Sequence, residues 1–510
     1  MKNLFSLNIL KTIISLRKLP LFLWGSFLLL CSLASCMDDE EYSVSPDDRL
    51  FFSVDTVKLD TVISGQLTNT YTFQVYNPGK KALRIPRVYL ESGSASPYRV
   101  NVDGTFLEGG AAGDFEISDG DSLRVFLALN APDRDEDVPV AENDRLIFVT
   151  EAGVAQAVVL TAYGQSVIPL KGKVILSDTL LDARRPYQIL DSLYVAEGAT
   201  LRLGAGVTLL FHPEVNLTVD GTLLAEGTLE APVMFRGDRL GNMFSNQPYD
   251  RVPGQWGGVV LREKSYGNRL NYCDIHSGRF GIQCDSSDVD REKLRLENSI
   301  VHNMSGDVLS VRAAKVFVGN SQLTNAGGNC ITLHGGHSTF VHCTVGNFYA
   351  FKGGRGVALS FTNAEGDTRL PLYQAAFYNS IITGYSEDEI MGSRSERYEE
   401  DEFNYLFHRC LLNTPAYEDE KVQDCLWDGA EEDSLSREEN FYPEFDLKQL
   451  IFTFELAEKS KAVHAADAAI AKEYYPLDRN GRSRFLDDGP DLGCYEVDLS
   501  KFDQQETEGK

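Results

Sequence analysis

Short runs that alternate apolar and polar residues recur between residues 49 and 165. Examples are "TYTFQVYN" before Pro78 and Gly79, "DSLRVFLAL" after Asp119 and Gly120, and "RLIFVT" before Gly153. Alternation with a period of two, closed by turn residues, is typical of half-buried antiparallel strands. The pattern therefore predicts a β-sandwich over residues 49–165.

From about residue 190 the apolar runs become shorter. The stretch "LYVAEGATLRLGAGVTLLFHPEVNLTVDGTLLAEGTLEAPVMF" consists of strands of a few residues, each broken by Gly, Asn or Pro. In a parallel solenoid such a strand pairs with the equivalent strand one turn above and below, so it does not need to be long. We predict a parallel β-helix over residues 190–460, and residues 166–189 are either a linker or its first coil.

A short polar cue recurs within this region. "NYCDI", "ENSIV", "GNSQL", "VHCTV", "YNSII" and "HRCLL" place Cys or Ser at steps of 26, 22, 22, 37 and 30 residues. The smaller steps fit one solenoid turn, and the larger steps contain insertions at 355–374 and 387–404. We expect Asn298, Asn320 and Asn379 to stack at an equivalent turn of successive coils.

The N-terminus has the features of a secretory signal peptide over residues 1–35. Four cationic residues precede or open an apolar run from Leu19 to Leu33, which is too short to span a bilayer comfortably. "LASC" resembles the bacterial lipobox, and this resemblance implies that Cys36 carries the lipid. An ordinary secretory signal followed by an accidental Cys is the alternative.

The lipobox resemblance also predicts the location and one partner of the protein. Acyl chains on Cys36 would hold the protein on a membrane without a transmembrane helix. "MDDEE" after Cys36 resembles the acidic tag of surface-exported lipoproteins, or it is only part of a flexible charged tether over residues 36–48. We expect a lipid-anchored protein of the bacterial outer membrane that faces the exterior.

Charge and cysteine content exclude some classes of function. The formal net charge of -27 becomes -31 once the four cationic residues of segment 1–35 are removed, which argues against a nucleic-acid partner. Seven cysteines remain after Cys31 and Cys36, so they cannot all be paired. Since no CxxC occurs, we expect most of them to be small buried residues rather than metal ligands.

Two resemblances extend the fold prediction. The strands at 190–235 and "GQWGGVVL" at 254–261 resemble right-handed parallel β-helices of the secreted bacterial type, in the pectate-lyase-like superfamily. The segment "FQVYNPGKKALRIPRVYL" together with "VVLTAYGQ" resembles immunoglobulin-like modules that serve as spacers. The predicted fold class is all-β, an N-terminal immunoglobulin-like β-sandwich followed by a right-handed parallel β-helix.

The C-terminal region resembles the closing signature of such surface proteins. "DRNGRSRFLDDGPDLGCYE" fits Asp-x-x-Gly-x-x-Arg followed by Asp-[Ile/Leu]-Gly-x-Tyr-Glu, with Cys494 in place of the usual Ala; the matching residues are Asp478, Gly481, Arg484, Asp491, Gly493, Tyr495 and Glu496. An open solenoid end exposes strand edges, so we expect residues 461–497 to cap it, with Arg484 paired to Asp491 or Glu496. "KSKAVHAADAAIAKEYYP" is either a helix ended by Pro476 or a loop, and residues 498–510 are a flexible tail.

Catalytic candidates are few. The segment "CDIHSGRFGIQCDSSDVD" offers Asp274, His276, Arg279, Asp285, Asp288 and Asp290, and "NCITLHGGHSTFVHC" offers His334, His337 and His342. Hydrolysis of a glycoside requires two carboxylates across the sugar, and a lyase requires a base and often calcium. Asp274, Asp285, Asp288, His334 and His337 are the candidates, and His334 and His342 would lie near His276 if the coils align. No other cofactor or metal is expected.

Exposed aromatic residues are a second resource, because aromatic rings stack on sugar faces. The candidates in the coil region are Trp256, Tyr266, Phe348, Tyr349, Phe351, Tyr373 and Tyr378. The favoured function is non-catalytic binding of a polysaccharide or another envelope component, or adhesion, by the flank of the β-helix and its two insertions. The alternatives are a polysaccharide lyase or glycoside hydrolase, and a purely structural envelope component.

Overall fold

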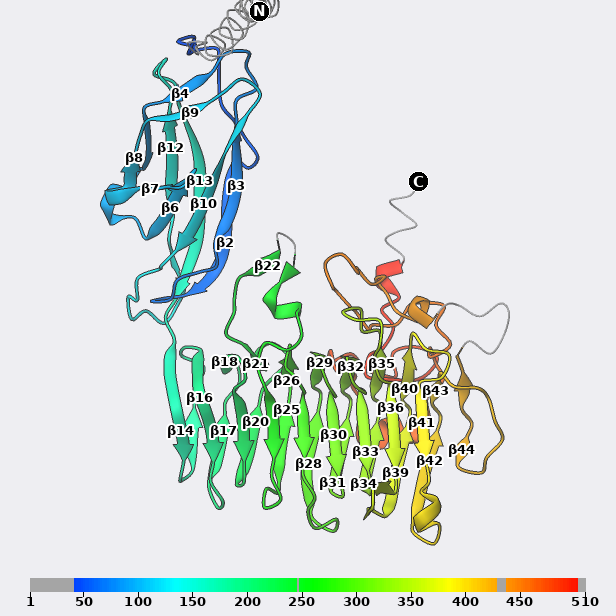
Figure 1. Cartoon of the computed structure of the whole chain (residues 1–510). Coiled ribbons are helices and arrows are strands. Elements are labelled where there is room, and N and C mark those ends of the chain that lie inside the picture. The colour runs from blue at the N-terminus through cyan, green and yellow to red at the C-terminus, as the bar shows by residue number, and fades with distance from the viewer. Residues whose placement is uncertain (1–40, 245–246, 429–436, 503–510) are drawn as a thin grey trace, which may run out of the picture. The chain divides into compact units, whose positions relative to one another are not determined.

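A computed structural model describes residues 41–244, 247–428 and 437–502 (Figure 1). Contacts divide the chain into two compact units: one comprises residues 70–129, 143–160 and the chain before residue 58, and the other comprises residues 58–69, 130–142 and the chain from residue 161. Cys36 and the rest of segment 1–40 lie outside the described residues. Among the described residues no helix combines the length and the apolar character needed to cross a membrane.

The N-terminal region is an antiparallel β-sandwich. One sheet has the order β1 (Phe51–Phe52), β3 (Tyr71–Tyr76), β10 (Ser122–Leu129), β6 (Tyr98–Val102) and β7 (Thr105–Phe106). The other has the order β11 (Val140–Ala141), β13 (Ala155–Gln165), β12 (Asp144–Val149), β5 (Arg87–Leu90) and β8 (Ala111–Ala112), and β2 (Thr56–Ile63) pairs with β13. A further pair is formed by β4 (Leu83–Ile85) and β9 (Phe115–Ile117).

The alternating pattern of the sequence accounts for these strands. In β10 the residues Leu123, Val125 and Leu127 are buried, whereas Arg124 and Phe126 between them are exposed. The short helical turns η1 (Gly93–Ala95) and η2 (Glu108–Gly110) lie in this region. Residues 41–48, expected to be part of a tether, instead start the sandwich, because the Ser43 N–H donates to the Ala82 carbonyl at 2.8 Å.

The second region is a parallel β-helix, as the sequence predicts. Its strands form three faces, visited in turn by each coil. Figure 1 shows strands of successive coils stacked side by side. The chain enters at β14 (Ile168–Ile175), which pairs in parallel with β16 (Tyr187–Val195), so residues 168–189 belong to the first coils. Both strands are long enough to contribute to two faces, and they join these two faces into one sheet of 18 strands among the described residues.

The first face continues through β18 (Thr208–Phe211), β21 (Val233–Gly237), β26 (Cys273–His276), β29 (Ile300–Met304), β32 (Gln322–Ala326), β35 (Thr344–Asn347), β40 (Ile381–Gly384), β43 (Leu411–Leu412) and β45 (Leu426–Trp427). The second comprises β19 (Asn216–Val219), β24 (Gly258–Leu261), β27 (Ile282–Cys284), β30 (Leu309–Arg312), β33 (Ile331–His334), β36 (Leu359–Thr362) and β41 (Ile390–Ser393).

The third face comprises β15 (Thr179–Leu181), β17 (Thr200–Leu203), β20 (Thr222–Glu226), β25 (Asn268–Asn271), β28 (Glu292–Glu297), β31 (Lys315–Gly319), β34 (Gly336–Val341), β39 (Leu372–Tyr378), β42 (Phe403–His408) and β44 (Val422–Gln423). Three outer elements interrupt the coils. These are the hairpin of β22 (Asn242–Phe244) and β23 (Gln247–Pro248) followed by η3 (Tyr249–Arg251), the hairpin of β37 (Ala364–Glu365) and β38 (Thr368–Arg369), and η4 (Glu396–Tyr398).

Stacking of like residues builds the core. On the second face Leu217, Val259, Ile282, Leu309, Ile331 and Leu359 follow one another in register, and each is at least 99% buried. Each coil therefore supplies the apolar surface that its neighbour covers.

The predicted polar stack is present at the corner before the first face. Asn298, Asn320 and Asn379 have φ of 51°, 52° and 49°, in the left-handed region that Asn tolerates better than most residues. Asn320 Nδ2 donates to Asn298 Oδ1 at 2.8 Å. Residues without an amide occupy the same corner elsewhere, namely Tyr272, His342, Arg409 and Asp424.

The seven described cysteines are free, and six are buried, as expected; Cys425 is half-buried. Cys273, Cys343, Cys410 and Cys425 each follow a left-handed corner residue. They occupy the position that Ser299, Ser321 and Ser380 take in other coils. There the serine Oγ accepts a hydrogen bond from the backbone N–H of the equivalent residue in the preceding coil.

The C-terminal segment differs from its expected position. The last parallel strand among the described residues is β45, and residues 441–456 instead pack Phe441, Phe454 and Leu456 against Phe348 on the flank. They follow the 3-10 turn η5 (Arg437–Asn440), and α2 (Ala468–Tyr474) is the helix suggested by the Ala-rich stretch, with Asp467 as its N-cap.

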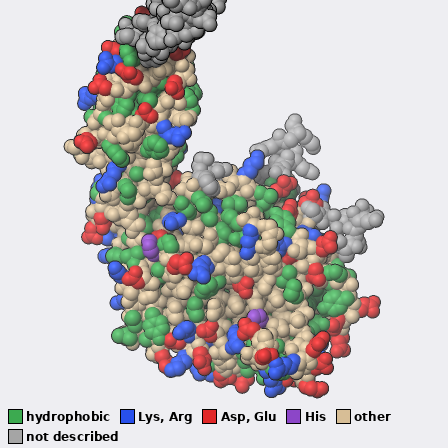
Figure 2. Space-filling view, in the orientation of Figure 1, with side chains coloured by type: hydrophobic (Ala, Val, Ile, Leu, Met, Phe, Trp, Pro, Cys, Tyr) green, Lys and Arg blue, Asp and Glu red, His purple; other side chains and the backbone are tan. Residues whose placement is uncertain are grey.

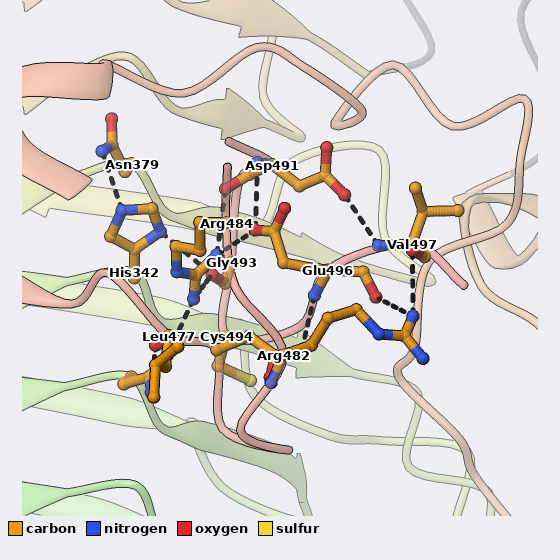
Figure 3. A network of polar contacts seen from close by, with 12 residues as sticks. His342, Asn379, Leu477, Arg482, Arg484, Asp491, Gly493, Cys494, Glu496 and Val497 are labelled. Atoms are coloured by element: carbon orange, nitrogen blue, oxygen red, sulfur yellow. Dashed lines mark hydrogen bonds and ion pairs between the residues drawn. The ribbon is translucent and has the colours of Figure 1, made fainter. Parts of the chain in front are cut away.

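The closing signature forms a buried polar network (Figure 3). Arg484 is fully buried and donates to Glu496 Oε1 at 2.5 Å and to the Gly493 carbonyl at 3.1 Å, so the expected ion pair is formed. The same guanidinium donates to Asn320 Oδ1 at 2.7 Å, and the Tyr495 hydroxyl donates to Gln322 Oε1 at 2.8 Å. These contacts place the signature along the flank of the coils, not over the open end.

Candidate functional site

The catalytic candidates from the sequence occupy separate positions. Asp285 accepts a hydrogen bond from its neighbour Gln283, and Asp288 is an exposed turn residue that accepts from the Asp290 N–H. His334 Nδ1 lies 3.4 Å from Glu365 on the β37–β38 hairpin. His337 lies near the start of β34 on the third face, in register with Lys315 and Gln374.

His342 is the corner residue of its coil and is fully buried beneath the closing signature. Its Nδ1 lies 3.2 Å from the Gly493 carbonyl, and its Nε2 lies 3.0 Å from Asn379 Nδ2. Burial, followed by the Arg484 charge, lowers the pKa of His342 well below its usual range. The prediction that His334 and His342 lie near His276 is wrong, because His302 on the next coil occupies that place.

Asp274 and His276 are part of a cluster on the outer side of the first face. His276 Nδ1 lies 2.8 Å from Asp274 Oδ1, and its Nε2 lies 2.7 Å from Asp250 Oδ1. His302 is in register with His276 on the adjacent strand, and its Nε2 lies 3.3 Å from the same Asp274 oxygen. We call Asp250, Asp274, His276 and His302 the histidine cluster.

Three elements, β26, β29 and η3, position the histidine cluster. Asp274 and His276 are two residues apart on β26, so their side chains project from the same side of the strand. Asp250 comes from η3, and Arg236 on β21 places its Nε 2.9 Å from Asp250 Oδ1. The side chain of His276 is 5% exposed, whereas those of Asp274 and His302 are 24% and 25% exposed.

The positive and negative charges of the histidine cluster stabilise one another. Burial opposes the ionised form of His276, but Asp274 and Asp250 outweigh it and raise the pKa of His276 to about 9. Burial likewise opposes ionisation of Asp250, yet His276 and Arg236 lower the pKa of Asp250 to about 2. With both ring nitrogens facing carboxylates, the protonated His276 is not available as a general base.

The aromatic ladder considered for the flank is not formed, because of its seven candidates three are buried, three (Tyr266, Phe351 and Tyr378) are half-buried and one is exposed. Trp256 is fully buried and stacks on Phe211 with ring centroids 4.3 Å apart, and Phe348 and Tyr349 are also buried. Arg291 covers the ring of Tyr266 at 3.8 Å. Tyr373, with 46% of its surface exposed, remains an outward-facing aromatic side chain.

A second site lies at the last coils, where loop 413–421 follows β43. Two cavities there share Tyr417, and we call them the terminal pocket. The outer one, of about 520 Å³, is lined by Tyr417, Glu418, Asp419, Glu420, Val422, Asp424, Cys425 and Trp427. The inner one, of about 270 Å³, is lined by Phe361, Ile390, Gly392, Phe403, Tyr405, Phe407, Leu412, Thr414 and Tyr417.

Rings and carboxylates meet in the terminal pocket. Tyr417 and Trp427 have ring centroids 6.0 Å apart, and Tyr417 is 46% exposed. The Tyr405 hydroxyl donates to Asp419 Oδ2 at 2.5 Å, and the carboxylates of Glu418 and Glu420 lie on exposed residues. Acidic side chains are also spread over the visible face of the β-helix, with Lys and Arg among them (Figure 2).

Sequence reasoning missed His302, Asp250 and the terminal pocket. The signal for His302 was present, because His276 and His302 are 26 residues apart, the same step that separates Cys273 from Ser299. "QDCLW" at 423–427 also repeats the cue of "HRCLL" and marks one more coil. Asp250 lies in an insertion that no repeat spacing predicts.

Comparisons with known proteins give only partial likenesses, and no family model matches the chain. The curated protein bark beetle of Drosophila melanogaster is 40% identical over 67 residues, which is 13% of this chain and 2% of that protein. Solved structures with some likeness include a GH87 alpha-1,3-glucanase catalytic unit from Streptomyces thermodiastaticus (11% identity, 70% of this chain, 75% of that chain, TM-score 0.29). A PapD-like domain of human CEP192 has 11% identity, 26% and 98% coverage and a TM-score of 0.16. The fold assignment rests on the strand pairing described above.

Proposed function

We propose that the protein is a lipid-anchored component of a bacterial outer membrane whose β-helix binds a glycan at the cell surface without chemical turnover. The signal-peptide pattern over residues 1–35 and the lipobox-like "LASC" ending at Cys36 support export and anchoring. In this proposal the N-terminal β-sandwich is an immunoglobulin-like spacer between the anchor and the β-helix.

The terminal pocket carries the binding part of the proposal. Sugar rings present apolar faces that stack on aromatic side chains and hydroxyl groups that require hydrogen-bond partners. Tyr417 and Trp427 supply the rings, and Glu418, Asp419 and Glu420 supply acceptors beside them. The flank of the β-helix offers no comparable set among the aromatic residues expected there.

The charge of the pocket selects the class of glycan. Glu418, Asp419, Glu420 and Asp424 all line the outer cavity, so an anionic polysaccharide would be repelled. The proposed ligand is therefore a neutral oligosaccharide or the neutral end of a longer glycan.

The test compares two tyrosines with the same exposed fraction. The full chain, its Tyr417→Ala variant and its Tyr373→Ala variant are purified in detergent and applied to a glycan array and to affinity gels that contain neutral or anionic polysaccharides. Loss of the Tyr417 ring should weaken retention on a neutral glycan about fivefold or more, since stacking is worth ~1 kcal/mol or more. Tyr373 on β39 has the same 46% exposed fraction, and Tyr373→Ala should leave retention on the neutral glycan unchanged.

Three outcomes would contradict the proposal. Equal loss of binding in both variants would mean that the pocket is not the site. Failure of the wild-type chain to bind any neutral glycan would favour a purely structural component, and release of reducing or unsaturated sugar ends would favour an enzyme.

A further inference from the structure

The histidine cluster contains a set of potential metal ligands that plays no part in the proposed glycan binding. It lies on coils distant from the terminal pocket in the strand order. Asp274, His276 and His302 each offer one ligand atom, and these three atoms lie within 4.8 Å of one another. They come from neighbouring strands, β26 and β29, whose register places His276 beside His302.

The orientation of His276 is the second observation. Its Nδ1 faces Asp274, whereas its Nε2 faces Asp250 at 2.7 Å. Metal-ligating histidines almost always donate their other ring N–H to a carboxylate, a backbone carbonyl or water, which fixes the tautomer and the plane of the ring. Arg236 in turn balances the charge of Asp250, with Nε 2.9 Å from Oδ1. Asp250 and Arg236 therefore form the outer support that a bound metal ion requires.

We propose that Asp274, His276 and His302 bind a divalent transition-metal ion of the zinc, iron or cobalt type. Two imidazoles and one carboxylate suit these ions, whereas calcium and magnesium prefer all-oxygen sites. Asp274 and His302 are about a quarter exposed, so an ion can enter from solvent and water or a small ligand can complete its coordination. Upon binding, the ion replaces the hydrogen-bonding proton between Nδ1 of His276 and Oδ1 of Asp274, and that proton passes to solvent.

The experiment measures metal content and metal spectra of the full chain, purified in detergent without a histidine tag. The chain is stripped with a chelator, dialysed against Zn²⁺, Co²⁺ or Ca²⁺, and analysed for bound metal. Wild-type protein should retain Zn²⁺ and Co²⁺ but not Ca²⁺, and bound Co²⁺ should give visible absorption bands of a nitrogen-ligated site.

The variants separate a built site from adventitious binding. His302→Ala should lose one equivalent of bound Zn²⁺ and the Co²⁺ bands. His334→Ala, which removes a similarly exposed histidine that contacts Glu365 instead, should keep both. Cys425→Ser, which removes the half-buried thiol, should also keep both. Asp250→Asn should weaken Zn²⁺ affinity roughly ten- to a hundredfold while a saturating concentration still loads one ion.

Equal Zn²⁺ content in the wild-type chain and His302→Ala would overturn the proposal, and so would loss of the Co²⁺ bands in His334→Ala. Unchanged far-ultraviolet circular dichroism shows that each variant is folded. The outcome is independent of the proposed function, because Tyr417→Ala should leave the metal content unchanged and His302→Ala should leave glycan retention unchanged.

Discussion

The carboxyl group of Glu496 is the most informative titratable group of the closing signature. Burial raises the pKa of Glu496 to about 7, although Arg484 favours its ionised form. Burial also raises the pKa of Asp478 and Asp491 nearby. The folded signature therefore holds a proton on Glu496 at a pH at which the unfolded chain has already released it.

This protonation makes the stability of the signature depend on pH. A group with a raised folded-state pKa contributes stability below its unfolded value of ~4.3, and that contribution is lost as the pH rises through the folded value. Raising the pH from 5 to 8 should therefore speed hydrogen–deuterium exchange in the segment 478–497. In Glu496→Gln the change with pH should be smaller, by an amount on the order of 1 to 3 kcal/mol in local opening free energy.

The measured rates are corrected for the intrinsic pH dependence of amide hydrogen exchange. Exchange in the segment 478–497 that slows as the pH rises would then contradict the predicted direction. Lys501→Gln serves as a control, because Lys501 is an exposed partner of Glu455 outside the signature.

Individual residues also show what the sequence made predictable. Asn298, Asn320 and Asn379 could be assigned to one corner because Asn is suited to positive φ and recurs beside the Cys or Ser cue. Tyr272 and Arg409 adopt the same φ although their side chains do not favour it. At those positions the pairing of the coil above and below overrides local preference, which a reading of single residues cannot detect.

At the scale of elements, the closing segment depends on close contact with the coils. Gly493 has a φ of 83°, and a Cβ at this position would lie 2.6 Å from Thr344 Oγ1 on β35. Thr344 also accepts the Cys494 N–H at 3.1 Å. A side chain at residue 493 would therefore both strain the backbone and push the segment away from β35.

Gly493→Ala should destabilise the docking of this segment by roughly 1 to 3 kcal/mol. Limited proteolysis should then cleave within residues 461–497 sooner than in the wild-type chain. Gly489→Ala is the matched control, because nothing lies within 4 Å of a Cβ built there and its φ is not in the left-handed range. Equal protection of the two variants would show that contact with Thr344 does not hold the segment.

The position of this segment could not be predicted from its motif. Arg484, Asp491 and Glu496 predicted a buried ion pair, and Arg484 with Glu496 forms it. Which surface the network covers is decided by partners far away in sequence, such as Asn320 and Gln322. The expectation of a cap over the end came from the general problem of exposed strand edges, and the motif itself does not record which surface it covers.

At the scale of the whole molecule, the proposed anchor has a direct test. Cys36→Ser, expressed in a bacterium with lipoprotein processing, should move the protein from the detergent phase to the aqueous phase of a Triton X-114 partition. It should also abolish labelling by an alkyne-tagged fatty acid, because two or three acyl chains make membrane binding stable and their loss removes it. Cys31→Ser, in the proposed signal peptide, is the control and should remain labelled. Labelling that persists in Cys36→Ser would contradict the anchor.

The fold was more predictable than the sites. Hydrophobic periodicity and the repeated cue reflect contacts between residues about one coil apart, so the sequence records them directly. The histidine cluster combines such a one-coil step, His276 to His302, with Asp250 from an insertion, and only the first part leaves a trace in the spacing. The terminal pocket forms at the last coils, and no local sequence pattern marks where the coils end.

The left-handed corner shared by seven coils has a consequence for how such a chain can change length. Tyr272, Asn298, Asn320, His342, Asn379, Arg409 and Asp424 have φ between 47° and 52°. A stretch cut at two neighbouring corners, such as 299–320, both enters and leaves with the same geometry, like one turn of a screw thread. Duplicating such a stretch would keep every other turn in register, so a gene could lengthen the β-helix wherever the added coil lies outside the surface that the closing signature covers, which includes Asn320.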